Sequence, residues 1–151
     1  AITMGEAKAF MQKYFERFAG LKAFYEQVEQ DAKSNHYVTT LAGRRRMLPD
    51  MESSNNQLAS LARRQAINTL IQGSAADIIK FAMNQVWQDN ELKELEARLI
   101  LQIHDELVLE VPEQNAVQAG KRMAAIMEQV VELDVPLAVD MGMGKNWDEA
   151  H

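Results

Sequence analysis

The sequence predicts a mixed α/β chain of the α+β kind, in which an antiparallel sheet packs on long helices. Two patterns indicate this class. Apolar residues recur with the 3.6-residue period of a helix over much of residues 6–89. The period shortens to two near residues 98–111, where two β-rich runs stand close enough in the chain to form a hairpin.

Two amphipathic helices are expected at the N-terminus. The first covers residues 6–18, and Thr3 together with Glu6 forms the capping box that precedes many helices. Gly20 is expected to end this helix, because glycine is a poor helix former. The second helix is expected from residue 21 to about residue 33.

A short strand and a basic turn follow. Residues 37–41 are rich in β-branched side chains, Gly43 permits a turn, and three consecutive arginines come next, before a break at Pro49. Residues 41–64 carry five arginines against two carboxylates, although the whole chain has a net charge of −6. A solvated arginine cluster and a surface that faces a polyanion are equally consistent with this distribution.

A long helix is predicted over residues 56–89. Gly73 lies inside it and costs up to ~1 kcal/mol relative to alanine, which suggests either close approach by another segment or a kink. Arg64, Asn68 and Gln72 recur every four residues and therefore share one face of the helix. From spacing alone, a solvated polar face is the simpler explanation of this stripe.

The hairpin predicted over residues 98–111 carries the most informative residues. Its connection, His104-Asp105-Glu106, contains no glycine and places two carboxylates side by side. Two adjacent carboxylates need a cation or full solvation, and a hard Mg²⁺ ion prefers such oxygen ligands. A water-exposed acidic turn is the simpler alternative. In a regular strand neighbouring side chains point to opposite faces, so one carboxylate would be the principal ligand.

The C-terminal part is expected to return to a helix over residues 113–132 and to end with a strand over residues 136–141. Asp140 on that strand is a weak candidate for a second acidic segment. The chain has no cysteine, which excludes disulfides and thiolate metal sites. It has no apolar run of 18 residues and no signal sequence, so we expect a cytoplasmic protein that does not cross a membrane.

Five segments together resemble one family. Residues 102–111, Gln-Ile-His-Asp-Glu-Leu-Val-Leu-Glu-Val, resemble the palm hairpin of family A DNA polymerases, the bacterial DNA polymerase I type. The other segments match the same family in the same order, and together they cover nearly the whole chain: residues 15–22, 40–49, 68–80, and 134–137 with 146–148.

The resemblance implies a fragment of a right-hand polymerase domain, its C-terminal fingers and palm portion. Residues 1–36 would be the helical part of the fingers, and residues 37–151 the palm. The enzyme would be a DNA-directed DNA polymerase of replication or repair, a transferase that moves a nucleotide from a dNTP to a primer 3′-hydroxyl. Its cofactor would be Mg²⁺, with two ions in the complete enzyme.

The resemblance also assigns roles to individual residues. Asp105 would be a catalytic metal ligand and Glu106 its less critical neighbour. His104 would sit beside the terminal phosphate of the primer. The stripe defined above would donate hydrogen bonds to minor-groove acceptors that all base pairs present, which suits a polymerase that senses pair geometry and not sequence. The three arginines at positions 44–46 would either bind phosphates or pin the fingers to the palm.

This chain also departs from the family pattern. Leu70 and Ala19 stand where the family usually has proline, Ser74 replaces threonine, and Arg63 replaces glutamate. The family's other metal-binding aspartate and its nucleotide-gripping helix lie outside this chain. We therefore expect the isolated chain to be inactive and to need the N-terminal part of the polymerase, primer–template DNA and dNTP as partners. A non-catalytic split subunit and a metal-dependent nuclease are the alternatives.

Overall fold

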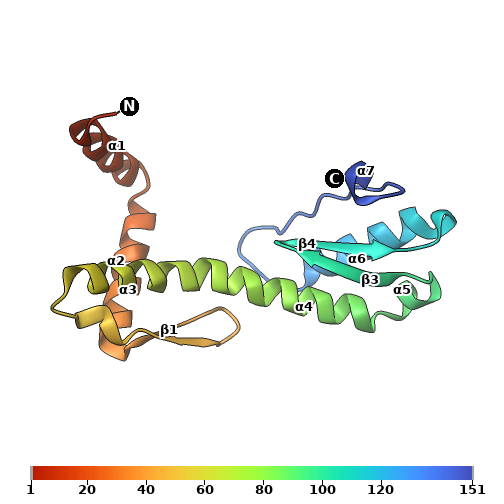
Figure 1. The fold of residues 1–151 in the computed structure, drawn as a ribbon, viewed down its shortest axis with the longest axis horizontal. Coiled ribbons are helices and arrows are strands. Elements are labelled where there is room, and N and C mark those ends of the chain that lie inside the picture. Colours follow the sequence, from red (N-terminus) through yellow and green to blue (C-terminus); the bar gives the residue numbers. More distant parts are fainter. Residues whose placement is uncertain (1, 151) are drawn as a thin grey trace. The chain divides into compact units, whose positions relative to one another are not determined.

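A computed structural model describes residues 2–150, which fall into two compact units, Ala1–Ser74 and Ala75–His151 (Figure 1). Each unit has its own buried apolar cluster. Helices joined to small antiparallel sheets make up both units, as predicted. Within residues 2–150, the structure contains no helix with the length and hydropathy needed to span a bilayer.

The first unit contains two N-terminal helices, a small sheet and a third helix that continues through a wider turn, so that residues 56–88 are helical without a break, as predicted for residues 56–89. In chain order these are α1 (Met4–Arg17), α2 (Ala19–Asn35), β1 (Tyr37–Thr39), β2 (Arg45–Met47), the 3-10 turn η1 (Pro49–Glu52), α3 (Asn56–Asn68) and the π-helical turn η2 (Thr69–Gly73).

The capping box at the start of α1 is confirmed. The Thr3 backbone N–H donates to Glu6 Oε2 at 2.7 Å, and the Glu6 N–H donates to Thr3 Oγ1 at 3.3 Å. The prediction that Gly20 ends this helix is wrong. The chain leaves the helical conformation at Phe18 (φ −113°, ψ 56°), and Gly20 lies inside α2, where a Cβ would have open space among the described residues.

One apolar cluster holds α2, the small sheet, η1 and α3 together. Leu48 and Met51 are each only 1% exposed, and small alanines of α2 and α3 allow close packing around them. The members of the cluster are Val28, Ala32, Val38, Leu48, Met51, Ala62 and Ala66. The strands β1 and β2 pair antiparallel above it, with Val38 opposite Arg46. This core therefore fixes the hairpin that carries the three arginines.

The second unit packs a β-hairpin against helices. Its elements are α4 (Ser74–Gln88), α5 (Asn90–Glu94), β3 (Arg98–Ile103), β4 (Glu106–Glu110), η3 (Glu113–Asn115), α6 (Ala116–Gln129) and α7 (Trp147–Ala150). Its core joins Ala82 and Val86 of α4 to Leu107 of β4 and to Ala119 and Ile126 of α6, with Leu92 of α5. The prediction of an antiparallel hairpin packed on helices is thus confirmed.

The pairing of β3 with β4 is irregular at one point. Leu99 lies opposite Leu109, but Leu101 lies opposite Val108, so Ile100 is an extra residue in β3. Such a bulge bends its strand and changes which residues face the core. Ile100, outside the regular register, is 53% exposed.

The strand predicted over residues 136–141 does not form. These residues make no ladder with another strand. Their polar contacts run to a helix instead, since the Val139 N–H donates to Glu128 Oε1 at 3.1 Å, next to the end of α6. Met141 fills the space above Gly120, where a Cβ would lie 2.3 Å from its Sδ. Asp140 is therefore not on a strand.

An ion pair ties α6 to the start of α5. Asp89 caps α5 by accepting from the Leu92 N–H at 2.9 Å, and its Oδ2 accepts from Arg122 Nε at 3.1 Å and Nη2 at 2.6 Å. The Asp89 side chain is only 11% exposed. The hydrogen bonds from Arg122 hold the pKa of the Asp89 carboxyl below its ordinary value of 3.8, and the Leu92 cap adds to this lowering.

We expect Asp89→Asn to lower the free energy of unfolding by about 1 kcal/mol at neutral pH, because asparagine keeps the cap but loses the ion pair. A depressed carboxyl pKa stabilises the fold above the unfolded value; this contribution declines as the pH falls below about 4 and is lost once the pH passes below the lowered native pKa. Urea unfolding should therefore show a smaller difference between the two proteins at pH 3 than at pH 7. Glu91→Gln, which removes a more exposed partner of Arg122, should cost under about 0.5 kcal/mol.

Candidate nucleic-acid interface and metal site

The hairpin tip is formed by His104 and Asp105 alone. Ile103 pairs with Glu106, so β3 and β4 are joined by a two-residue turn. His104 has φ 53°, the left-handed conformation that a tight hairpin turn demands of its first residue. Asp105 thus lies in the turn, and Glu106 is the first residue of β4. The strand alternation assumed from the sequence consequently does not apply to this pair of carboxylates.

Gln102 stabilises this turn, a role that the sequence did not suggest. Its side-chain amide donates to the His104 carbonyl oxygen, two residues along the chain. A left-handed residue other than glycine costs roughly 1–2 kcal/mol, and this hydrogen bond offsets part of that cost. His104 and Asp105 are exposed and Glu106 is half-buried, with Leu107 anchored in the core beside them. The acidic tip is therefore presented to solvent on a fixed support.

The carboxylates of Asp105 and Glu106 suit one side of an open Mg²⁺ site. Magnesium is usually held by one or two carboxylates, with waters and substrate phosphates completing its six oxygen ligands. Among residues 2–150, the structure gathers no group of three or more His, Asp or Glu side chains that could hold a metal ion. The described part of the chain could hence supply only part of a ligand set, which Asp140 does not complete.

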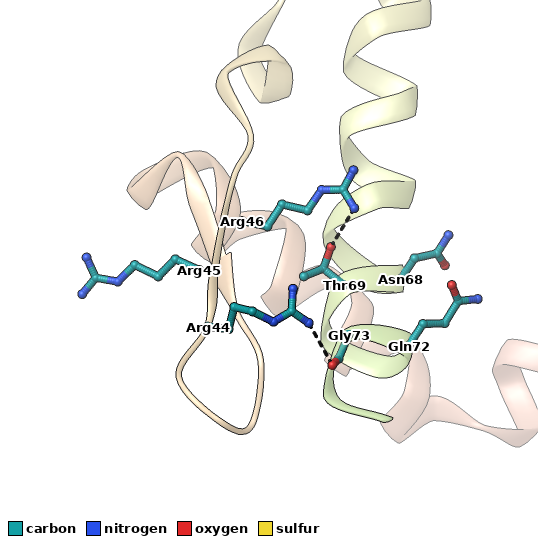
Figure 2. A pocket seen from close by; sticks show the side chains of 7 residues that line it. All are labelled: Arg44, Arg45, Arg46, Asn68, Thr69, Gln72 and Gly73. Carbon is teal, nitrogen blue, oxygen red and sulfur yellow. Dashed lines mark hydrogen bonds between the residues drawn. The ribbon is translucent and has the colours of Figure 1, made fainter. Parts of the chain in front are cut away.

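The predicted polar stripe is exposed along its whole length. Arg64 and Asn68 lie on α3 and Gln72 lies on η2. Arg64 Nη1 donates to Ser60 Oγ at 3.1 Å and lines a hollow at the start of α3. Asn68 and Gln72 line a different pocket, and their carboxamides project to the same side of the helix (Figure 2).

The pocket that holds Asn68 and Gln72 has a volume of about 420 Å³ and is strongly basic. Figure 2 shows the two amides projecting to one side of the helical turn, while two arginine side chains reach the other side. The lining residues are Arg44, Arg45, Arg46, Asn68, Thr69, Gln72 and Gly73. Among residues 2–150, the charged side chains that line it are all arginines, so the pocket favours an anionic or hydrogen-bond-accepting ligand.

The side chains of the three consecutive arginines point alternately to opposite sides of the strand. Arg44 Nη2 donates to the Gly73 carbonyl oxygen at 3.0 Å, and Arg46 Nη1 lies 3.4 Å from Thr69 Oγ1 (Figure 2). Arg45 points the opposite way, and its guanidinium carbon lies 4.7 Å from the centre of the Tyr37 ring. Two of the arginines therefore tie the β-hairpin of the first unit to η2.

The presence of glycine at position 73 is explained by the close approach of another segment, which is one of the two predicted alternatives. A Cβ at this position would lie 3.0 Å from Thr40 Cγ2 and 3.3 Å from Arg44 Nη2. The next residue extends the contact, because Ser74 Oγ accepts from the Leu41 N–H at 3.0 Å. The loop between β1 and β2 thus lies against the end of η2.

Arg63, the departure from the family's glutamate, faces α2. Its Nε lies 3.7 Å from Glu29 Oε2, and both side chains are partly exposed. A long, exposed ion pair of this kind contributes at most about 1 kcal/mol. Arg63 is therefore placed to support the packing of α2 on α3.

Comparison with known proteins points to one family. A sequence profile of DNA polymerase family A matches residues 1–149. DNA polymerase I of Bacillus subtilis is 48% identical over 149 residues, and the thermostable DNA polymerase I of Thermus filiformis is 44% identical over 145 residues. These alignments cover 99% and 96% of this chain, but only 17% of each relative. The chain therefore spans about a sixth of the length of its curated relatives.

A solved structure shows the same fold. The POL domain of Pol1 from M. smegmatis, in complex with DNA primer–template and dNTP, superposes with a TM-score of 0.93 at 44% sequence identity. The match covers 99% of this chain and 26% of that chain. The similarity of fold and sequence thus extends over nearly every residue of this chain.

Proposed function

This chain belongs to DNA polymerase family A, and we propose that it forms the C-terminal fingers and palm portion of a template-directed DNA polymerase. Residues 1–36 would belong to the fingers and residues 37–151 to the palm, a division that follows the family resemblance and differs from the two compact units. The complete enzyme would transfer nucleotides from dNTP to a primer 3′-hydroxyl. The solved relative bound to primer–template and dNTP supports these partners.

The hairpin tip carries this proposal. Asp105 is exposed at the end of a β-ribbon whose base is buried against α4 and α6, so the backbone that carries its carboxylate is supported by a packed core. We assign Asp105 as a metal ligand, Glu106 as an auxiliary carboxylate, and His104 as a contact to the primer end. Magnesium ions, when bound in the complete enzyme, would stabilise the attacking and leaving oxygens.

The exposed stripe would contact the duplex. The side chains of Arg64, Asn68 and Gln72 are long or amide-bearing, carry N–H donors and are open to solvent. Purine N3 and pyrimidine O2 accept hydrogen bonds in the minor groove of every base pair, so these donors would sense pair geometry without reading sequence. A mispair displaces those acceptors, which gives the stripe a role in fidelity.

The partial ligand set predicts that this chain does not polymerise alone. We expect no Mg²⁺-dependent primer extension by the 151-residue chain. Extension should appear when it is mixed with the upstream part of the Bacillus subtilis relative, truncated where the alignment begins, and should cease when EDTA removes the metal. Gel-resolved extension of a labelled primer measures both, with the full-length relative as positive control.

Three outcomes separate the possibilities. Robust extension by the chain alone would overturn its incompleteness. Extension only on mixing supports a split or excised polymerase part. Metal-dependent cleavage of the template by the chain alone would indicate the nuclease alternative instead.

A further inference from the structure

Arg44 contacts the helical turn in which Gln72 lies. The turn is η2, and Gln72 is the residue before Gly73, whose carbonyl oxygen accepts from Arg44 Nη2 at 3.0 Å (Figure 2). The Arg44 side chain reaches the backbone of this turn, whereas the Gln72 carboxamide projects away from it. A change at Arg44 would therefore act on Gln72 through the backbone between them.

The contact depends on the absence of a side chain at position 73. Thr40 Cγ2 and Arg44 Nη2 occupy positions 3.0 Å and 3.3 Å from where a Cβ would stand. The backbone of the same loop is fixed as well, since the Arg44 N–H donates to Thr40 Oγ1 at 3.2 Å. The loop between β1 and β2 thus holds the Arg44 backbone at a fixed distance from η2.

The turn departs from α-helical geometry. A π-helical turn is rare and occurs mostly as a single wide turn inside an α-helix, frequently at a functional site, so the contacts that neighbouring segments make with it are of interest. A hydrogen bond from a charged guanidinium to a carbonyl oxygen is among the stronger contacts of this kind. Arg46 adds a second, longer contact one turn earlier, 3.4 Å from Thr69 Oγ1.

We propose that Arg44 is a positioning residue for duplex sensing: its bond to the Gly73 carbonyl sets the orientation in which η2 presents Gln72 to the minor groove. This inference rests on the proposed function of Gln72. It differs from a direct phosphate contact by Arg44, which would raise affinity for every duplex alike.

A double-mutant cycle in DNA binding tests the inference. The 151-residue chain would be titrated into two labelled primer–template duplexes, one fully matched and one with a mispair at the primer end, and binding followed by fluorescence anisotropy. The variants are Arg44→Ala, Gln72→Ala and the double variant. Arg45→Ala is the matched control, because it removes the same charge from the opposite side of the strand.

We expect Gln72→Ala and Arg44→Ala each to reduce the preference for the matched duplex by about fivefold. The double variant should lose no more than either single variant, because both act at one point. Arg45→Ala should lower affinity for both duplexes equally and leave the preference unchanged. Circular dichroism will show whether Arg44→Ala folds. If it does not, Gly73→Ala replaces it, because the added methyl group displaces the guanidinium without removing its charge, and it should reproduce the loss of preference.

The failures are distinguishable. If the wild-type chain shows no preference, or Gln72→Ala leaves the preference intact, the proposed role of Gln72 falls and the inference falls with it. If Gln72→Ala abolishes the preference but Arg44→Ala does not, only the inference is overturned. Additive losses, accompanied by a shallower salt dependence for Arg44→Ala, would assign Arg44 to direct phosphate binding.

Discussion

Primer extension by the reconstituted polymerase is expected to fall by at least about 1,000-fold when Asp105 is replaced by asparagine. The substitution keeps the size of the side chain and removes one carboxylate charge from the proposed metal site. Metal-ion stabilisation of the transition state contributes several kcal/mol, and each 1.36 kcal/mol corresponds to a factor of ten in rate. Single-turnover extension of a labelled primer, with all components saturating, measures the loss directly.

Glu106→Gln is the matched control for this prediction. It removes the same charge from the adjacent residue, but Glu106 is half-buried at the start of β4, whereas Asp105 is exposed in the turn. We expect a loss of no more than about tenfold. Equal losses for both variants would contradict the unequal roles assigned to them, and full activity of Asp105→Asn would remove Asp105 from the metal site altogether.

The hairpin that presents Asp105 was predictable because its signal is local. Strongly apolar β-rich runs on both sides of a short polar connection leave few alternatives, and residues 98–103 form β3 with the predicted bounds. The predicted strand over residues 136–141 shows the limit of the same reasoning. Met141 of this segment lies against Gly120 of α6, and no strand within residues 2–150 pairs with the segment.

The stripe of donors was only partly predictable. Helical spacing correctly placed Asn68 and Gln72 on one exposed face. It did not predict the π-helical turn or the bond from Arg44 to Gly73, which joins residues 29 positions apart. Contacts between a loop and a helix leave no periodic trace in a sequence. The glycine itself was the signal, since a tolerated glycine inside a helix indicates that something approaches closely.

The core beneath the basic hairpin should govern the stability of the first unit. Leu48 is 1% exposed within the cluster that joins α2, β1, η1 and α3, and its N–H donates to the His36 carbonyl at 2.8 Å. We expect Leu48→Ala to lower the free energy of unfolding by about 3 kcal/mol, because the lost burial and the cavity add together. Urea unfolding, followed by circular dichroism, measures this change.

Leu41→Ala removes the same atoms from the loop between β1 and β2, where the side chain is 68% exposed. It should change the free energy of unfolding by less than about 0.5 kcal/mol. The contrast matters for function, because Leu48 lies one residue beyond the strand that carries Arg45 and Arg46. If both leucines cost the same, the cluster would not be the support of the basic hairpin. A large loss for Leu48 alone would show that this core stabilises the unit that carries the arginines.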